Sequence, residues 1–348
     1  MLDDANVLNQ RDPNGALEVA CNQYQQTTFN VELKNIENDG RPINNIVVAG
    51  MGGSALAALI TKVWLKYDLN VPFEIVRGYN VAKYVDSNTL VIASSYSGNT
   101  EETANCLKDA QTRGAQLAVI TSGGKLMEIA KHSQIAYATL PTNFRPRMAV
   151  ILNLRALIAL LINFKLVEND KFTEIAETSD WLKTESAKWA ADIPSNDNYA
   201  KQLALKAVGK TAVFYGGPLT APVAYKWKIS WNENAKNLAF WNEYPEFNHN
   251  EFIGWTSHPV EKPFAVFDIV GSIENDRILE RFEISDRLLS GMRPKSTVLN
   301  LAGDTPIKQM LWGCILADFV SIYVAILNNV NPTPVQLIEK LKQELAEN

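Results

Sequence analysis

Two clusters of small and hydroxyl-bearing residues could bind a phosphate group. The first is Gly50-Met51-Gly52-Gly53-Ser54-Ala55, and the second is Ser94-Ser95-Tyr96-Ser97-Gly98-Asn99-Thr100. Each follows an apolar run and precedes a helical pattern. Hydroxyls and backbone N–H groups at a helix N-terminus can hold a phosphate dianion without Lys or Arg, because the helix dipole adds positive potential. Capping and turn chemistry would need one or two hydroxyls, whereas the second cluster supplies four.

The first cluster has two other interpretations. It matches the loose dinucleotide fingerprint GxGxxA, which also requires an acidic residue about 20 positions later at the end of the second strand. That strand ends here in Val76-Arg77-Gly78, and both Asp68 and Glu74 are badly placed. A nicotinamide cofactor is therefore disfavoured, and we expect no cofactor. A tight strand-to-helix turn without a ligand stays an alternative.

The two clusters together resemble the sugar isomerase (SIS) domain, a flavodoxin-like module that binds phosphorylated sugars. The whole chain resembles the bifunctional phosphoglucose/phosphomannose isomerase family, which has two such domains. Five motifs extend the resemblance in family order: Met1-Leu2-Asp3-Asp4, Arg145-Pro146-Arg147, Asn232-Glu233-Asn234-Ala235-Lys236, Asn248-His249-Asn250-Glu251 and Pro332-Thr333-Pro334-Val335. One departure is Ala317-Asp318-Phe319, where relatives read Gly-Asp-Trp; we interpret it as helix packing.

The resemblance implies roles for individual residues. It makes Glu233 the proton-transferring base, Arg147 the group that stabilises the enediolate, and His249 the acid and base of ring opening. It also places a lysine of the last helix near the sugar ring. This lysine is Lys340, with Lys342 as the alternative. The remaining positions are substrate contacts: Ser54, Ser95, Ser97 and Thr100 at the phosphate, and Gly52, Gly53 and Thr333 elsewhere on the substrate.

These roles fit the isomerisation of glucose 6-phosphate, and of mannose 6-phosphate, to fructose 6-phosphate. A carboxylate can take the C2 proton and return it to C1, and an Arg beside the enediolate oxygens stabilises charge that appears only in the transition state. Each residue alone has a simpler explanation. Glu233 could be a solvated helix residue, His249 a hydrogen-bonding turn residue, and Lys340 part of a charged helix face.

The elements that must position these residues follow an α/β pattern. Continuous apolar runs at 46–49, 73–76, 89–93 and 117–120 predict buried parallel strands, with helices at 55–67 and 100–113 between them, the second closed by Gly114. The apolar stretch 148–164 predicts a buried core helix, and 168–191 a polar helical segment. Apolar runs at 211–215, 264–267 and 297–301 predict the strands of a second, similar unit.

We therefore predict two flavodoxin-like domains, each a mainly parallel sheet flanked by helices. The first is expected at 1–165 with an N-terminal extension, a helical linker at 166–196, and the second at 197–348 with a C-terminal helix. Family resemblance implies a homodimer in which His249 reaches the site of the partner subunit.

Composition excludes several other classes of protein. A net charge of −5 without a basic block argues against nucleic-acid partners. The acidic N-terminus leads into no apolar segment, and the three cysteines form no CxxC pair, so we expect a cytoplasmic protein without a membrane span. The histidines His132, His249 and His258 form no ligand-spaced cluster, so we expect no metal. Two functional alternatives remain: a sugar-phosphate-binding regulator, and an isomerase of another phosphosugar.

Overall fold

The computed structural model describes residues 1–37, 39–256 and 263–347. The chain forms two compact units. The first unit comprises Asn22–Lys183 and Ala302–Leu311, and the second comprises Met1–Cys21, Thr184–Leu301 and Trp312–Asn348. The domain boundaries expected from the sequence, at 165, 166–196 and 197, stay a prediction.

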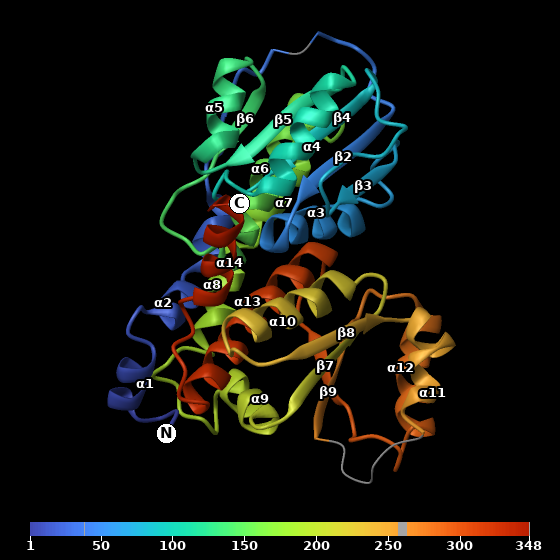
Figure 1. The fold of residues 1–348 in the computed structure, drawn as a ribbon. Helices are drawn as coiled ribbons and strands as arrows, with labels where there is room; N and C mark the ends of the chain where they lie inside the picture. Colours follow the sequence, from blue (N-terminus) through green and yellow to red (C-terminus); the bar gives the residue numbers. More distant parts are fainter. Residues whose placement is uncertain (38, 257–262, 348) are drawn as a thin grey trace. The chain divides into compact units, whose positions relative to one another are not determined.

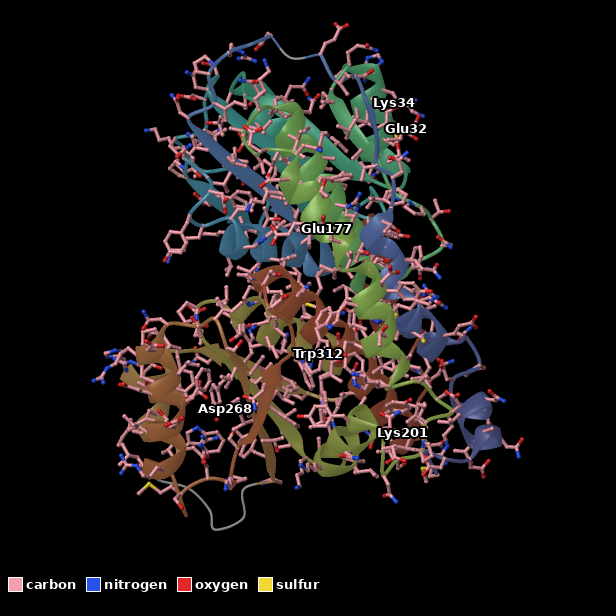
Figure 2. The ribbon with its side chains drawn as sticks, turned by 180° about the vertical axis from the view of Figure 1, so that it is seen from behind. Glu32, Lys34, Glu177, Lys201, Asp268 and Trp312 are labelled. Atoms are coloured by element: carbon pink, nitrogen blue, oxygen red, sulfur yellow. The ribbon has the colours of Figure 1, made fainter. Side chains whose placement is uncertain are left out.

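A six-stranded sheet forms the centre of the first unit, in the order β1-β6-β5-β4-β2-β3. All neighbouring strands are parallel except β1, which runs antiparallel to β6. The predicted strands are β2 (Asn45–Gly50), β3 (Phe73–Val76), β4 (Thr89–Ser94) and β5 (Gln116–Thr121), and the sequence analysis missed β1 (Glu32–Lys34) and β6 (Ala136–Thr139). Glu32 and Lys34 form an ion pair on the edge strand β1, where both are labelled in Figure 2, and such charges disfavour pairing with a further strand.

Helices cover both faces of this sheet. Figure 1 shows α4 (Glu101–Thr112) and α5 (Gly124–His132) on one face, and the view from behind in Figure 2 shows α6 (Val150–Asn163) on the other. Helix α6 packs against α3 (Gly52–Trp64) and confirms the predicted core helix. The first unit also contains two 3-10 helices, η1 (Gln23–Thr28) and η2 (Pro146–Met148).

The predicted helix at 55–67 starts earlier than expected, because the helical turn of α3 already includes Gly52 and Gly53. The helix predicted at 100–113 is α4, and Gly114 follows it with φ +74°, as expected of a residue after a helix C-terminus. The polar segment predicted at 168–191 contains two helices, α7 (Asp170–Glu177) and α8 (Ser179–Ala187).

The second unit has a four-stranded parallel sheet in the order β10-β9-β7-β8. The strands β7 (Thr211–Gly216), β9 (Phe264–Gly271) and β10 (Thr297–Leu301) were predicted, and β8 (Ala239–Glu243) was missed. Figure 1 shows α11 (Glu251–Gly254) and α12 (Asp276–Leu288) on one side of the sheet and α10 (Ala221–Glu233) on the other. Other helices of this unit are α1 (Ala5–Arg11), α2 (Ala16–Cys21), α9 (Tyr199–Ala207), η3 (Glu246–His249) and α14 (Gln336–Glu347).

The long apolar helix α13 (Pro306–Leu327) contains residues 317–319, which the sequence analysis interpreted as helix packing without predicting the bounds of the helix. Its length and composition would suit a membrane span, and 94% of its most apolar window is buried. Such burial is typical of the core helix of a globular domain. Within the second unit, the carbonyl of Gly313 in this helix accepts a hydrogen bond from the buried indole N–H of Trp227 in α10. The distance between the two atoms is 3.0 Å.

Candidate active site

The second sequence cluster forms the loop between β4 and α4 and carries three of the predicted phosphate contacts. Ser95 is buried, and its Oγ lies 2.7 Å from Thr100 Oγ1. Ser97 is exposed, and its Oγ accepts the N–H of Asn99 at 3.3 Å. Thr100 stands at the N-cap of α4 without making a side-chain capping bond. The hydroxyls are therefore not consumed by capping, and the first turn of α4 keeps N–H groups for an anion.

The neighbouring β5–α5 loop holds this loop in place. The carbonyl of Tyr96 accepts hydrogen bonds from the N–H and the hydroxyl of Ser122, at 2.9 and 2.6 Å. Gly98 has φ +70°, and a Cβ on it would lie 1.8 Å from the carbonyl oxygen of Gly123. No other residue fits there, so the glycine lets the two loops meet and fixes the orientation of the serines.

The first sequence cluster forms the turn between β2 and α3, beside the loop just described. Strands β2 and β4 pair in parallel, with Gly50 opposite Ser94, so both loops leave the same edge of the sheet. Ser54 is buried in the first turn of α3, and α3 has no side-chain cap. Gly52 is exposed with φ +52°. The carboxyl edge of a parallel sheet is where ligands bind in open α/β folds.

Gly53 explains how Arg147 reaches this edge. A Cβ on Gly53 would lie 2.6 Å from the carbonyl oxygen of Pro146 and 3.4 Å from the Cα of Arg147. Without that atom, the backbone of η2 packs directly on the N-terminus of α3. Arg147 is 1% exposed. A buried guanidinium acts in a medium of low dielectric constant, where its charge interacts more strongly than it would in water. The first unit thus brings together Gly52, Gly53, Ser54 and Arg147.

Glu233 is the last residue of α10 in the second unit and is half-buried. The Nζ of Lys236 donates hydrogen bonds to the carbonyl of Glu233 and to the carbonyl of Pro332, the latter at 2.9 Å. Asn232 donates to the carbonyl of Asn237 at 2.9 Å and closes the turn after the helix. Lys236 therefore joins the segment of the predicted base to the segment of Thr333, although the sequence analysis gave Lys236 no role.

A groove of about 770 Å³ opens beside Glu233. Its walls come from the end of α10 and the segment after it, and from the stretch that leads into α14. They are formed by Asn232, Glu233, Lys236, Asn237, Leu238, Val330, Asn331, Pro334, Val335, Gln336, Leu337 and Ile338. Thr333 is half-buried within that stretch, and its N–H donates to Asn331 Oδ1 at 2.9 Å. A carboxylate at the wall of such a groove can reach a substrate of sugar size.

His249 lies on η3, and Lys340 lies on α14, whose first residues line the groove; neither side chain is among the described residues that line it. His249 is exposed at the end of η3, and the side chains of Asn248 before it and Glu251 after it make hydrogen bonds. Asn248 donates to Ser285 Oγ at 2.9 Å and accepts from Arg281 at 3.0 Å. Glu251 accepts from the hydroxyl of Tyr215 and from Asn242. The backbone of His249 is therefore fixed although its imidazole is open to solvent.

Lys340 is exposed on α14, and its Nζ lies 3.7 Å from Glu344 Oε1, an i,i+4 pair. This contact is the one that a charged helix face makes, and the catalytic roles of Lys340 and Lys342 stay predictions. His258 lies outside the described residues. In the part of the chain that the structure describes, no group of three or more His, Cys, Asp or Glu side chains is arranged to hold a metal ion.

Two family models match the chain. The SIS domain matches residues 41–160, and the bacterial phospho-glucose isomerase C-terminal SIS domain matches residues 196–345. A bifunctional phosphoglucose/phosphomannose isomerase of Caldicellulosiruptor bescii is 35% identical over 309 residues, which cover 88% of this chain and 90% of that protein. A D-glucosamine-6-phosphate 4-epimerase of Sulfolobus acidocaldarius is 34% identical over 217 residues, or 59% of this chain and 62% of that protein.

The fold has relatives among solved structures. The crystal structure of a glucose-6-phosphate isomerase like protein from Thermus thermophilus superposes with a TM-score of 0.65 at 16% identity, covering 98% of each chain. Together with the two SIS matches, this confirms the predicted α/β fold with two SIS domains.

Proposed function

Because this chain belongs to the bifunctional phosphoglucose/phosphomannose isomerase family, we propose that it interconverts glucose 6-phosphate and mannose 6-phosphate with fructose 6-phosphate. The observation that carries the proposal is the 35% identity to an enzyme of that name over nine-tenths of its length. Glucose and mannose 6-phosphates differ only at C2 and give the same enediol, so one base can serve both substrates.

In the proposed mechanism, the hydroxyls of Ser54, Ser95, Ser97 and Thr100 and the N–H groups at the starts of α3 and α4 bind the phosphate. His249 protonates the ring oxygen and deprotonates the anomeric hydroxyl, because an imidazole can both donate and accept a proton. Lys340 assists at the sugar ring. These steps give the open-chain sugar.

Glu233 then removes the C2 proton, and the electron pair of that C–H bond forms the C1–C2 double bond of a cis-enediolate. The same carboxyl returns the proton to C1 while the proton of the C2 hydroxyl passes to O1, which leaves the C2 carbonyl of the ketose. General-base help of this kind is worth about 10² to 10⁴ in rate. Arg147 stabilises the negative charge that develops on the enediolate oxygens. Thr333, a short side chain, leaves room for rotation about the C2–C3 bond.

The test is incubation of the purified protein with glucose 6-phosphate or mannose 6-phosphate in the presence of a strong chelator, with detection of fructose 6-phosphate. We expect turnover of both sugars, undiminished by the chelator. Activity that is lost to the chelator and restored by zinc would contradict metal independence. A sugar-phosphate-binding regulator would bind these compounds and convert none of them.

A second candidate activity is supported by the epimerase relative, which is 34% identical over 217 residues. Glucosamine 6-phosphate therefore belongs in the same assay, with separation of its C4 epimer from the starting compound. Faster epimerisation of the aminosugar than isomerisation of either hexose phosphate would replace the primary proposal with this one.

We further propose a cytoplasmic homodimer in which His249 acts in the site of the partner subunit. A two-fold dimer then contains two equivalent sites. Co-expression of Glu233→Gln with His249→Ala tests this arrangement, because one site of each mixed dimer combines both lesions and the other contains intact Glu233 and intact His249. Random pairing should restore about a quarter of wild-type sites. Verified mixed dimers as inactive as the parents would show that His249 works within its own chain or is not catalytic.

A further inference from the structure

The loop that carries Arg147 is held by two buried side chains from other segments of the first unit. The hydroxyl of Tyr96 donates to the carbonyl of Pro141 at 2.5 Å and accepts the N–H of Phe144 at 2.9 Å. Gln26, in η1, donates from Nε2 to the carbonyl of Met148 at 2.7 Å. These bonds enclose the segment 141–148, which contains Arg147.

Tyr96 is well suited to fix this loop. Its backbone belongs to the phosphate-binding loop, between Ser95 and Ser97, and its carbonyl is held by two hydrogen bonds from Ser122. The side chain is 6% exposed, so the ring has little freedom. Burial raises the pKa of the Tyr96 phenol, which keeps the hydroxyl protonated and able to donate. The phenol therefore connects the serine cluster to the loop of Arg147 without touching either functional group.

We infer that Tyr96 and Gln26 are positioning residues that hold Arg147 at the place where the enediolate charge develops. The inference rests on the proposed isomerase function and adds two residues that act through Arg147. The physical reason is geometric. A guanidinium stabilises a transition state only when its distance to the developing charge is maintained, and a displacement of about 1 Å can cost about 10²-fold in rate.

Substituting Tyr96 by Phe removes both hydrogen bonds and keeps the buried ring. Gln26→Met removes the bond to Met148 and keeps a side chain of similar length. Tyr137→Phe is the matched control, because Tyr137 is a buried tyrosine of the same unit, in β6, that packs in an apolar cluster with residues of α5. Each variant is assayed for kcat and KM with glucose 6-phosphate, for inhibition by inorganic phosphate, and for thermal unfolding.

We expect Tyr96→Phe to lower kcat about tenfold or more, with KM and the inhibition constant of inorganic phosphate within about twofold of wild type. The reason for the split is that the backbone bonds from Ser122, which hold the serine cluster, remain. Gln26→Met should show the same split, and Tyr137→Phe should match wild type. If Tyr96→Phe does not fold, Gln26→Met decides the question in its place.

A double-mutant cycle separates positioning from a general structural effect. On an Arg147→Gln background, Tyr96→Phe should cause less than about a twofold further loss, because its target is already gone. An equal loss on both backgrounds, or an unchanged kcat of Tyr96→Phe in an active enzyme, would overturn the inference. A wild-type protein that converts none of the hexose phosphates would instead refute the proposed function, independently of these variants.

Discussion

A buried polar network holds α10, the helix that ends in Glu233. The Oδ1 of Asp318 in α13 accepts hydrogen bonds from Lys226 Nζ at 2.6 Å and from Ser230 Oγ at 2.8 Å. The side chains of Lys226 and Asp318 are 1% and 0% exposed. Asn234 donates to Ser321 Oγ of α13 at 2.9 Å. Lys226 and Ser230 are four residues apart on one face of α10, and Asn234, its C-cap residue, follows four residues later, so the network defines how that helix faces α13.

The structure predicts strongly coupled effects of substituting this ion pair. Asp318→Asn leaves a buried ammonium without its counter-charge, and Lys226→Met leaves a buried carboxylate without its own. Each should cost about 3–5 kcal/mol in free energy of unfolding, because a buried charge that loses its partner keeps its desolvation penalty. The double variant buries no charge at this place and keeps an amide oxygen for Ser230. We expect it to lose no more than about 2 kcal/mol, which implies a coupling energy of at least about 4 kcal/mol.

Urea unfolding followed by tryptophan fluorescence can measure these values in the second unit. Of the eight tryptophans, six belong to it: Trp189, Trp227, Trp231, Trp241, Trp255 and Trp312. Lys206→Met, at an exposed position of α9, serves as the control and should change the free energy of unfolding by less than about 0.5 kcal/mol. A double variant as unstable as the sum of the two single variants would refute the reasoning, because the two charges would then act independently.

Three further predictions concern the site and its surroundings. Glu233→Gln should reduce turnover to less than about a tenth of wild type with affinity for phosphate ligands nearly unchanged. Ser97→Ala should instead weaken binding of both hexose phosphates. Steady-state kinetics and inhibition by phosphate measure both effects. Thr333→Gln should lower the turnover of mannose 6-phosphate more than that of glucose 6-phosphate, and equal losses would contradict a role in specificity. Burial, opposed by the Arg293 guanidinium, raises the pKa of Asp268 to about 6. The folded protein therefore retains a proton that the unfolded chain releases above about pH 4, so the free energy of unfolding of wild type should fall by roughly 3 kcal/mol relative to Asp268→Asn between pH 4 and 7. Urea titrations across that range would contradict the shift if the difference stayed constant.

The sequence revealed those features that depend on local pattern. The buried parallel strands appear as continuous apolar runs, and the two strand-to-helix loops, for which phosphate binding stays a prediction, as small and hydroxyl-bearing residues. The missed strands have weaker patterns. β6 reads Ala-Tyr-Ala-Thr, and β1 has three residues with charges at both ends. Such segments become strands by pairing with a neighbour, and pairing partners distant in the chain leave no local signal.

The contacts that complete the site are long-range, and the sequence did not predict them. Gly53 admits the backbone of Pro146 from more than 90 residues away along the chain, and Lys236 connects Glu233 with Pro332. Both residues lie within motifs that were noted in the sequence, but their spacing could not indicate what they touch. Family resemblance supplied roles for single residues, whereas the structure supplies the contacts that hold those residues in position.

The proposed mechanism assigns phosphate binding and stabilisation of the transition state to different groups of the first unit. The loops that follow β2 and β4 present hydroxyls and N–H groups at the starts of two helices, and such donors bind a phosphate equally in the ground state and in the transition state. Uniform binding of this kind lowers KM and leaves kcat unchanged. Arg147 comes from another element, η2, where it is buried and packs through its backbone on Gly53. In the proposed mechanism this cation acts on the enediolate oxygens instead of the phosphate, so its binding energy is available to the transition state. Tyr96 belongs to the loop between β4 and α4 and bonds to the loop of Arg147, so the two loops are held in a defined position relative to each other.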